Sequence, residues 1–103
     1  MTPKPKTIKI LDVTYTVEYV DKPSEVDIFK RESMFGQIDY WTRSIRIFDK
    51  DRSDQDVQRT IWHEILHGIV EQIHIKWATD SDEDIVDRLA LGINSVCHDN
   101  GVT

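Results

Sequence analysis

The chain has few of the features that mark secreted, membrane or nucleic-acid-binding proteins. Its only cysteine is Cys97, which excludes an internal disulfide and is typical of a reducing compartment. No apolar run approaches the roughly 20 residues that span a bilayer, and residues 1–6 lack the apolar core of a signal peptide. The net charge of −6 shows no excess of basic residues for binding nucleic acid or an anionic membrane. We therefore expect a cytoplasmic protein that binds neither.

The rest of the composition is that of an ordinary globular domain. The 103 residues are 39% hydrophobic and 31% charged, which suits one domain with one core. We expect residues 1–103 to form that single domain, with residues 1–5 as a loose leader. Nothing in the sequence indicates an oligomeric state.

The first half of the chain has the patterns of β-strands. β-Branched and aromatic residues alternate in two regions, which predicts two hairpins with strands at about 7–11, 14–20, 36–40 and 45–48. Asp12-Val13 is the expected turn of the first hairpin. In the last strand Ile45 and Ile47 should face the core, with Arg46 pointing outward. Residues 21–33 fit either a short helix from Pro23 to Arg31 or an irregular connection.

The second half has the period of α-helices. A helix is expected from about Asp54 to Ile75, with Ser53 as its N-terminal cap. A last helix is expected from about Asp80 to His98, with Thr79 or Ser81 as its cap. Its core face would consist of apolar residues at helical spacing, namely Ile85, Val86, Leu89, Ala90, Ile93, Val96 and Cys97. The predicted class is α+β, a small antiparallel or mixed sheet of two hairpins followed by two packed helices.

The first predicted helix carries the motif His-Glu-x-x-His, as His63, Glu64 and His67. Residues four apart lie on one helix face, so both imidazoles can bind one ion. Glu64 is rotated to the side, within reach of a water on that ion. This is the arrangement of a hydrolytic zinc site. The alternative is that both histidines are ordinary side chains of a half-buried helix, but apolar residues cover most of the circumference and leave a narrow polar stripe.

A catalytic zinc site needs a third protein ligand. The candidates are His74, His98 and the carboxylates of the last helix. His74 follows His67 by seven residues, about 10 Å along the helix axis, which is too far to share the ion. The longer motif His-Glu-x-x-His-x-x-Gly-x-x-His is also absent, since Val70 and Ile73 stand at its glycine and last histidine.

His63-Glu64-Ile65-Leu66-His67 followed by Glu83-x-x-x-Asp87 resembles the gluzincin metallopeptidases, which include thermolysin. The resemblance implies that Glu83 is the third zinc ligand and that Asp87 accepts a hydrogen bond from His63, a role that ligating histidines usually require. Asp82 is the rival ligand. The strands-then-helices order and small size are most similar to the ImmA/IrrE-type peptidases, over about residues 35–98. Phages and mobile elements often carry these as proteases that cut repressors. The resemblance implies a zincin-like fold.

The expected activity is therefore zinc-dependent hydrolysis of a peptide bond in a regulatory protein, with Glu64 as the base. Tyr40, His74 and His98 are candidate donors to the oxyanion, and an edge strand within 35–41 could pair with an extended substrate. Two alternatives remain open. One is a zinc-binding regulatory protein that does not cut, and the other is a globular domain without metal.

Overall fold

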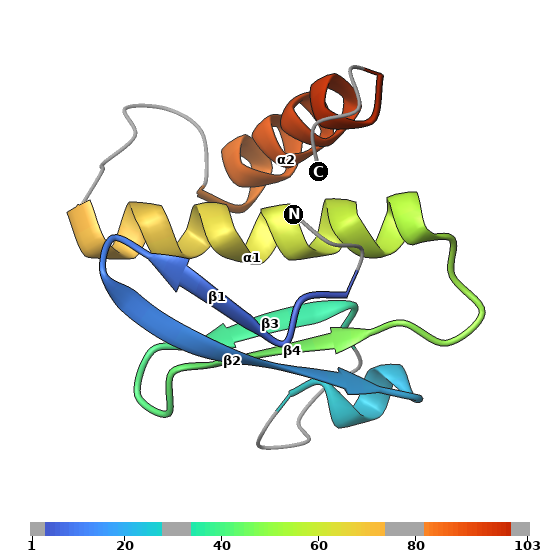
Figure 1. The fold of residues 1–103 in the computed structure, drawn as a ribbon, viewed down its shortest axis with the longest axis horizontal. Coiled ribbons are helices and arrows are strands. Elements are labelled where there is room, and N and C mark those ends of the chain that lie inside the picture. The colour runs from blue at the N-terminus through green and yellow to red at the C-terminus, as the bar shows by residue number, and fades with distance from the viewer. Residues whose placement is uncertain (1–3, 28–33, 74–81, 100–103) are drawn as a thin grey trace.

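The computed structural model describes residues 4–27, 34–73 and 82–99 and has the expected α+β architecture (Figure 1). Four strands, with a short 3-10 helix among them, precede two α-helices. The elements are β1 (Thr7–Ile10), β2 (Val13–Val20), η1 (Pro23–Glu25), β3 (Gly36–Asp39), β4 (Ser44–Phe48), α1 (Asp54–Ile73) and α2 (Asp82–Asp99). No helix in the described ranges is both long and apolar enough to cross a membrane.

The four strands form one mixed sheet in the order β1-β2-β4-β3. Both predicted hairpins are confirmed, because β1 pairs antiparallel with β2 and β3 pairs antiparallel with β4. The first turn lies one residue earlier than expected, at Leu11 and Asp12, which both adopt positive φ in place of the usual glycine. β2 and β4 run parallel in the middle of the sheet, so β3 is an edge strand.

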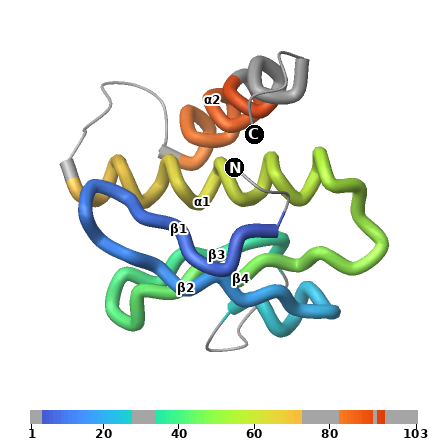
Figure 2. Tube along the Cα trace, viewed as in Figure 1, coloured from blue at the N-terminus to red at the C-terminus, as the bar shows by residue number. Residues whose placement is uncertain are grey.

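Helix α1 lies across one face of this sheet, and α2 lies on the other side of α1 (Figures 1 and 2). Ile45 and Ile47 point into the core and are fully buried, as expected. Arg46 points to the opposite face of the sheet, where its guanidinium donates to the Glu25 carbonyl oxygen. The main core consists of aliphatic side chains and one tyrosine, and contains Ile10, Tyr15, Val17, Ile45, Ile47, Val57, Ile61 and Ile65.

The segments around the sheet differ partly from expectation. Of the two alternatives for residues 21–33, the described part has the three-residue 3-10 helix η1 followed by a turn at 26–27, and residues 28–33 lie outside it. Of the expected leader, Lys4 forms an ion pair with Asp49 at 2.7 Å, and the Pro5 carbonyl accepts a hydrogen bond from the Tyr19 hydroxyl. These two residues are therefore attached to the sheet.

The start of α1 follows the predicted cap. The Ser53 hydroxyl accepts a hydrogen bond from the Asp56 amide, and acidic residues occupy the first turn, where the helix dipole favours negative charge. Further along α1, Gly68 allows the helix to approach the sheet closely. A Cβ at this position would lie 2.8 Å from Cδ1 of Ile10. The expected last residues of this helix, His74 and Ile75, lie outside the described residues.

Helix α2 contacts α1 through a narrow seam. Val86 and Ala90 are fully buried, and the Asn94 side chain donates to the Gln55 carbonyl oxygen of α1 at 3.1 Å. The expectation that Leu89 belongs to the core face is wrong, because Leu89 is 45% exposed. The seam is centred on Val86, Ala90 and Asn94, and helical geometry places Leu89 beside it. The expected caps, Thr79 and Ser81, lie outside the described residues.

Candidate metal centre

The two histidines of the motif converge as the helical period requires. His63 and His67 lie one turn apart on α1, and their Nε2 atoms are 3.1 Å apart. A tetrahedral ion with bonds of 2.0–2.1 Å separates two nitrogen ligands by about 3.3 Å. The two imidazoles therefore already stand close to the spacing that a shared ion needs.

Glu83 brings a carboxylate from the first turn of α2 to the same point. Its two oxygen atoms lie 2.8 Å from Nε2 of His63 and 2.8 Å from Nε2 of His67. One ligand atom from each of the three residues lies within 4.8 Å of the others, so this group can hold a metal ion. Two imidazole nitrogens and a carboxylate oxygen form a donor set that zinc accepts, and the group fits such an ion. The Glu83 side chain is 68% exposed, which leaves the group open to solvent.

Glu64 is buried beside this group, under the edge strand β3. It is 5% exposed, and a Cβ at Gly36 would lie only 2.9 Å from its Oε2. Burial raises the pKa of Glu64 to about 8, with a contribution from the negative charge of Glu83, while a hydrogen bond from the Ile38 backbone opposes the shift. In the absence of a metal ion, this carboxyl group therefore binds a proton far more readily than an ordinary glutamate.

Asp87 lies one turn after Glu83, where it meets the other nitrogen of His63. Its Oδ1 is 3.6 Å from Nδ1 of His63, longer than a good hydrogen bond. The guanidinium of Arg59 is 3.4 Å from both oxygen atoms of Asp87. The two nitrogens of His63 thus face two carboxylates of the same helix, Glu83 at Nε2 and Asp87 at Nδ1.

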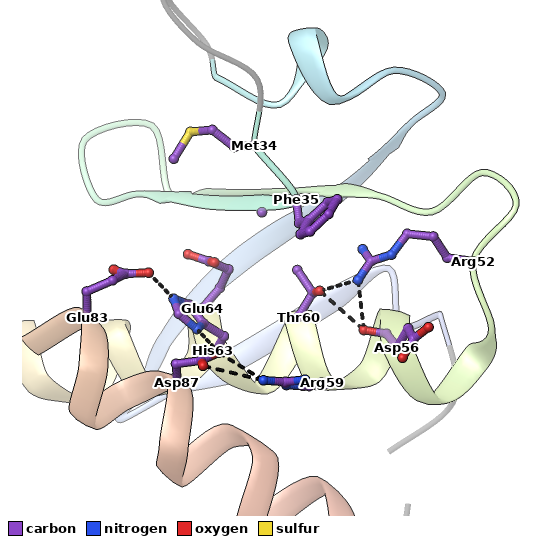
Figure 3. Close-up of a pocket in the computed structure, with 11 residues that line it drawn as sticks. Met34, Phe35, Arg52, Asp56, Arg59, Thr60, His63, Glu64, Glu83 and Asp87 are labelled. Atoms are coloured by element: carbon purple, nitrogen blue, oxygen red, sulfur yellow. Dashed lines mark hydrogen bonds and ion pairs between the residues drawn. The ribbon is translucent and has the colours of Figure 1, made fainter.

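The candidate metal-ligating group opens, through His63 and Glu83, into a pocket of about 690 Å³ between β3, α1 and α2 (Figure 3). Phe35, Arg52 and Arg59 line this pocket, and the sequence analysis did not select them. Arg52 extends over the Phe35 ring, 4.7 Å from its centroid, and donates to the Phe48 carbonyl and the Thr60 hydroxyl. Arg59 precedes His63 by one turn, so its spacing from the motif was the only sequence signal of its position.

The other candidate residues have different placements. The Tyr40 hydroxyl donates to the His67 carbonyl oxygen at 3.1 Å, and Tyr40 does not line the pocket. His74 lies outside the described residues, and Asp82 and His98 belong to α2 but their side chains are not among those described. The described structure therefore brings together His63, Glu64, His67, Glu83 and Asp87.

No protein-family model matches the chain, and no curated protein or solved structure shows significant similarity to it. The chemistry of the pocket must therefore be inferred from its own residues. These are three convergent side chains that could hold a metal ion, a buried carboxyl group beside them, and a carboxylate behind one of the histidines.

Proposed function

We propose that the protein is a zinc-dependent peptidase of the gluzincin type, with His63, His67 and Glu83 as metal ligands. The observation that carries this proposal is the convergence of both Nε2 atoms on the Glu83 carboxylate, with Glu64 buried at their side. A purely structural zinc site normally closes with a fourth protein ligand. Among the described residues only three side chains form the group, which leaves a coordination position for water or substrate.

A zinc ion held by these residues would lower the pKa of a bound water and polarise a substrate carbonyl. Glu64 takes the proton from the attacking water and later transfers it to the leaving amine. The water oxygen first adds to the carbonyl carbon, and the C–N bond then breaks as the departing nitrogen receives this proton from Glu64. Asp87 lies 3.6 Å from Nδ1 of His63 and would accept a hydrogen bond from it after a small approach, which would keep the Nε2 lone pair directed at the ligand position.

The substrate in this proposal is an extended segment of a protein. β3 is an edge strand that borders the pocket at Gly36. The Ile38 amide already bonds to Glu64, so an added strand would pair with the remaining outer backbone groups, those of Gly36 first. A peptide paired with β3 would pass beside Glu64 and the metal ligands. The resemblance to ImmA/IrrE-type peptidases suggests a regulatory protein as substrate, such as a repressor of a phage or mobile element.

One observation favours a second function, that of a zinc-binding regulatory protein which does not cut. Glu64 is 5% exposed and lies under Gly36 of β3. A base in this position reaches a substrate water only if the pocket admits that water between the strand and the helix. In this alternative the ion links α1 to α2, and its binding energy stabilises the fold.

Zinc stoichiometry and peptide cleavage together test the proposal. We expect about one zinc per chain in the wild-type protein, and much less in His67→Ala and Glu83→Ala. Glu64→Gln should retain zinc and lose cleavage of unfolded protein substrates or repressor-like proteins. A protein with zinc but no cleavage by the wild type would support the regulatory alternative. A folded wild-type protein that binds no added zinc would refute both functions.

A further inference from the structure

Arg59 forms the outermost link of a chain of polar contacts that ends at the metal-ligating group. Its Nη2 atom lies 3.4 Å from both oxygen atoms of Asp87, and Asp87 Oδ1 lies 3.6 Å from Nδ1 of His63 (Figure 3). Within the described part of the chain, the Arg59 side chain has no other hydrogen bond or ion pair, and Asp87 has none beyond Arg59 and His63. Among these residues, Arg59 therefore reaches the metal-ligating group through Asp87, and His63 is the member that also contacts Glu83 and His67.

The position of α2 does not depend on this contact. Val86 and Ala90 are fully buried against α1, and Asn94 donates to the Gln55 carbonyl oxygen. These contacts place the Asp87 backbone, whereas the Asp87 side chain is 52% exposed and can rotate into water. The Arg59 side chain is itself 41% exposed, and such a surface ion pair adds little to stability. We therefore expect the Arg59–Asp87 ion pair to affect mainly the rotamer of the Asp87 side chain.

We propose that Arg59 is a positioning residue of the metal centre, which acts by holding the Asp87 carboxylate against Nδ1 of His63. With Asp87 in this place and an ion bound, Nδ1 carries the proton and Nε2 presents its lone pair to the ion that it would share with His67 and Glu83. The inference rests on the proposed metal-binding function, since it concerns the orientation of one of its ligands.

Charge alone predicts the opposite effect, which makes the inference testable by the direction of a change. Arg59 is a cation close to a site for a divalent cation, so its removal should relieve repulsion and tighten metal binding. If Arg59 acts through Asp87, its removal should instead weaken binding, because the orienting carboxylate is released. The two explanations therefore differ in sign as well as in magnitude.

The experiment measures the zinc dissociation constant by competition with a chromophoric chelator, in wild type, Arg59→Gln, Asp87→Ala and the double variant. Loss of a residue that orients a metal ligand typically weakens metal binding 10- to 100-fold, which we expect for Asp87→Ala. For Arg59→Gln we expect roughly three- to tenfold weaker zinc binding, because Arg59 contacts Asp87 and not the ligand His63 itself. In the Asp87→Ala background, Arg59→Gln should cause no further weakening.

Two further variants separate position from charge. Arg59→Lys keeps a cation near Asp87 but loses the planar fork of the guanidinium, so it should recover part of the lost affinity. Lys50→Gln removes the same charge from an exposed residue that does not line the pocket, and should leave zinc affinity unchanged.

A spectroscopic measurement on the zinc-loaded protein supplies a signal that a merely structural role would not change. The Nδ1 proton of His63 should exchange with solvent faster in Arg59→Gln than in wild type, while the backbone amide spectrum of α2 stays the same. Equal or tighter zinc binding by Arg59→Gln would overturn the inference while leaving the proposed function intact. So would a weakening that persists in the Asp87→Ala background. A wild-type protein without zinc affinity would overturn both.

Discussion

Helix α1 has two faces that are held in different ways. The face on the sheet consists of apolar side chains such as Val57, Ile61 and Ile65, which are at most 8% exposed. The face toward Glu83 and Asp87 consists of Arg59, His63 and His67. Their polar atoms contact these two carboxylates of α2. Burial of apolar surface stabilises the first face without any ligand. On the second face, the side chains would be stabilised mainly by a bound cation.

The apolar core and the proposed metal site thus depend on different residues of the same helix. A change on the sheet face should affect folding, and a change on the carboxylate face should affect metal binding. Glu64 lies between the two, since it is buried like a core residue but carries an ionisable group. The predictions below test this division, from the largest expected effect to the smallest.

Ile61→Ala should cause the largest loss of stability, because Ile61 is fully buried between α1 and the sheet. A buried Ile→Ala substitution lowers the free energy of unfolding by about 2–5 kcal/mol through lost transfer energy and the remaining cavity. Urea denaturation followed by circular dichroism measures this difference. A loss below about 1 kcal/mol would show that the sheet face is not the main source of stability.

Glu64→Gln should change the pH dependence of stability in the metal-free protein. The folded-state pKa of Glu64 is raised to about 8, so the folded state binds more protons than the unfolded state above pH 4.5. Wild-type stability should therefore fall as pH rises from about 4.5 to 8, by a few kcal/mol, since each pKa unit corresponds to about 1.4 kcal/mol. The variant should lack this decline. Thermal denaturation at several pH values, with a chelator present, measures the difference. If stability changed with pH in the same way in wild type and Glu64→Gln, the raised pKa of Glu64 would be contradicted.

Zinc should stabilise the wild-type protein through the carboxylate face. At a free concentration 100 times the dissociation constant, a ligand that binds only the folded state adds about 2.7 kcal/mol. Thermal denaturation with and without zinc measures the shift, and a chelator should reverse it. His67→Ala and Glu83→Ala serve as matched controls, in which zinc should have little effect. An equal shift in these variants would place the zinc elsewhere.

Gly36→Ala should affect both properties, because Gly36 lies directly over the boundary between the two faces. The added Cβ would meet Cγ2 of Thr60 at 2.7 Å and Oε2 of Glu64 at 2.9 Å. We expect a destabilisation of about 1–3 kcal/mol, typical of overpacking, together with slower peptide cleavage as Glu64 is displaced. Zinc stoichiometry should not change, since the metal ligands lie outside this contact.

Leu89→Gln should have the smallest effect, although the apolar pattern of α2 includes this residue. Leu89 is 45% exposed and lies beside the seam with α1. Surface substitutions of this kind usually change stability by less than about 0.5 kcal/mol. Val86→Ala is the matched comparison, because Val86 is fully buried on the same helix and should cost clearly more. Similar losses in both variants would show that Leu89 is covered in solution.

The sequence predicted the elements more accurately than their relations. Alternation identified the strand pairs, and capping chemistry identified the start of α1 at Ser53. The error at Leu89 arose because apolar spacing marks a wide helix face, whereas a single neighbouring helix covers only a narrow one. The parallel pairing of β2 with β4 was not specified beyond a mixed or antiparallel sheet, since no local pattern encodes which hairpins lie side by side.

By itself, the sequence determined that His63 and His67 share one face of a helix, since helical geometry relates residues four apart whatever surrounds them. Only the tertiary structure decided that Glu83 meets both Nε2 atoms, that Gly36 covers Glu64, and that Arg59 reaches Asp87. These contacts depend on how α2 and β3 pack against α1. That packing is determined by apolar burial over the whole chain, so no local pattern marked Gly36 or Arg59, whereas Glu83 and Asp87 were predicted only through the spacing that the resemblance supplied.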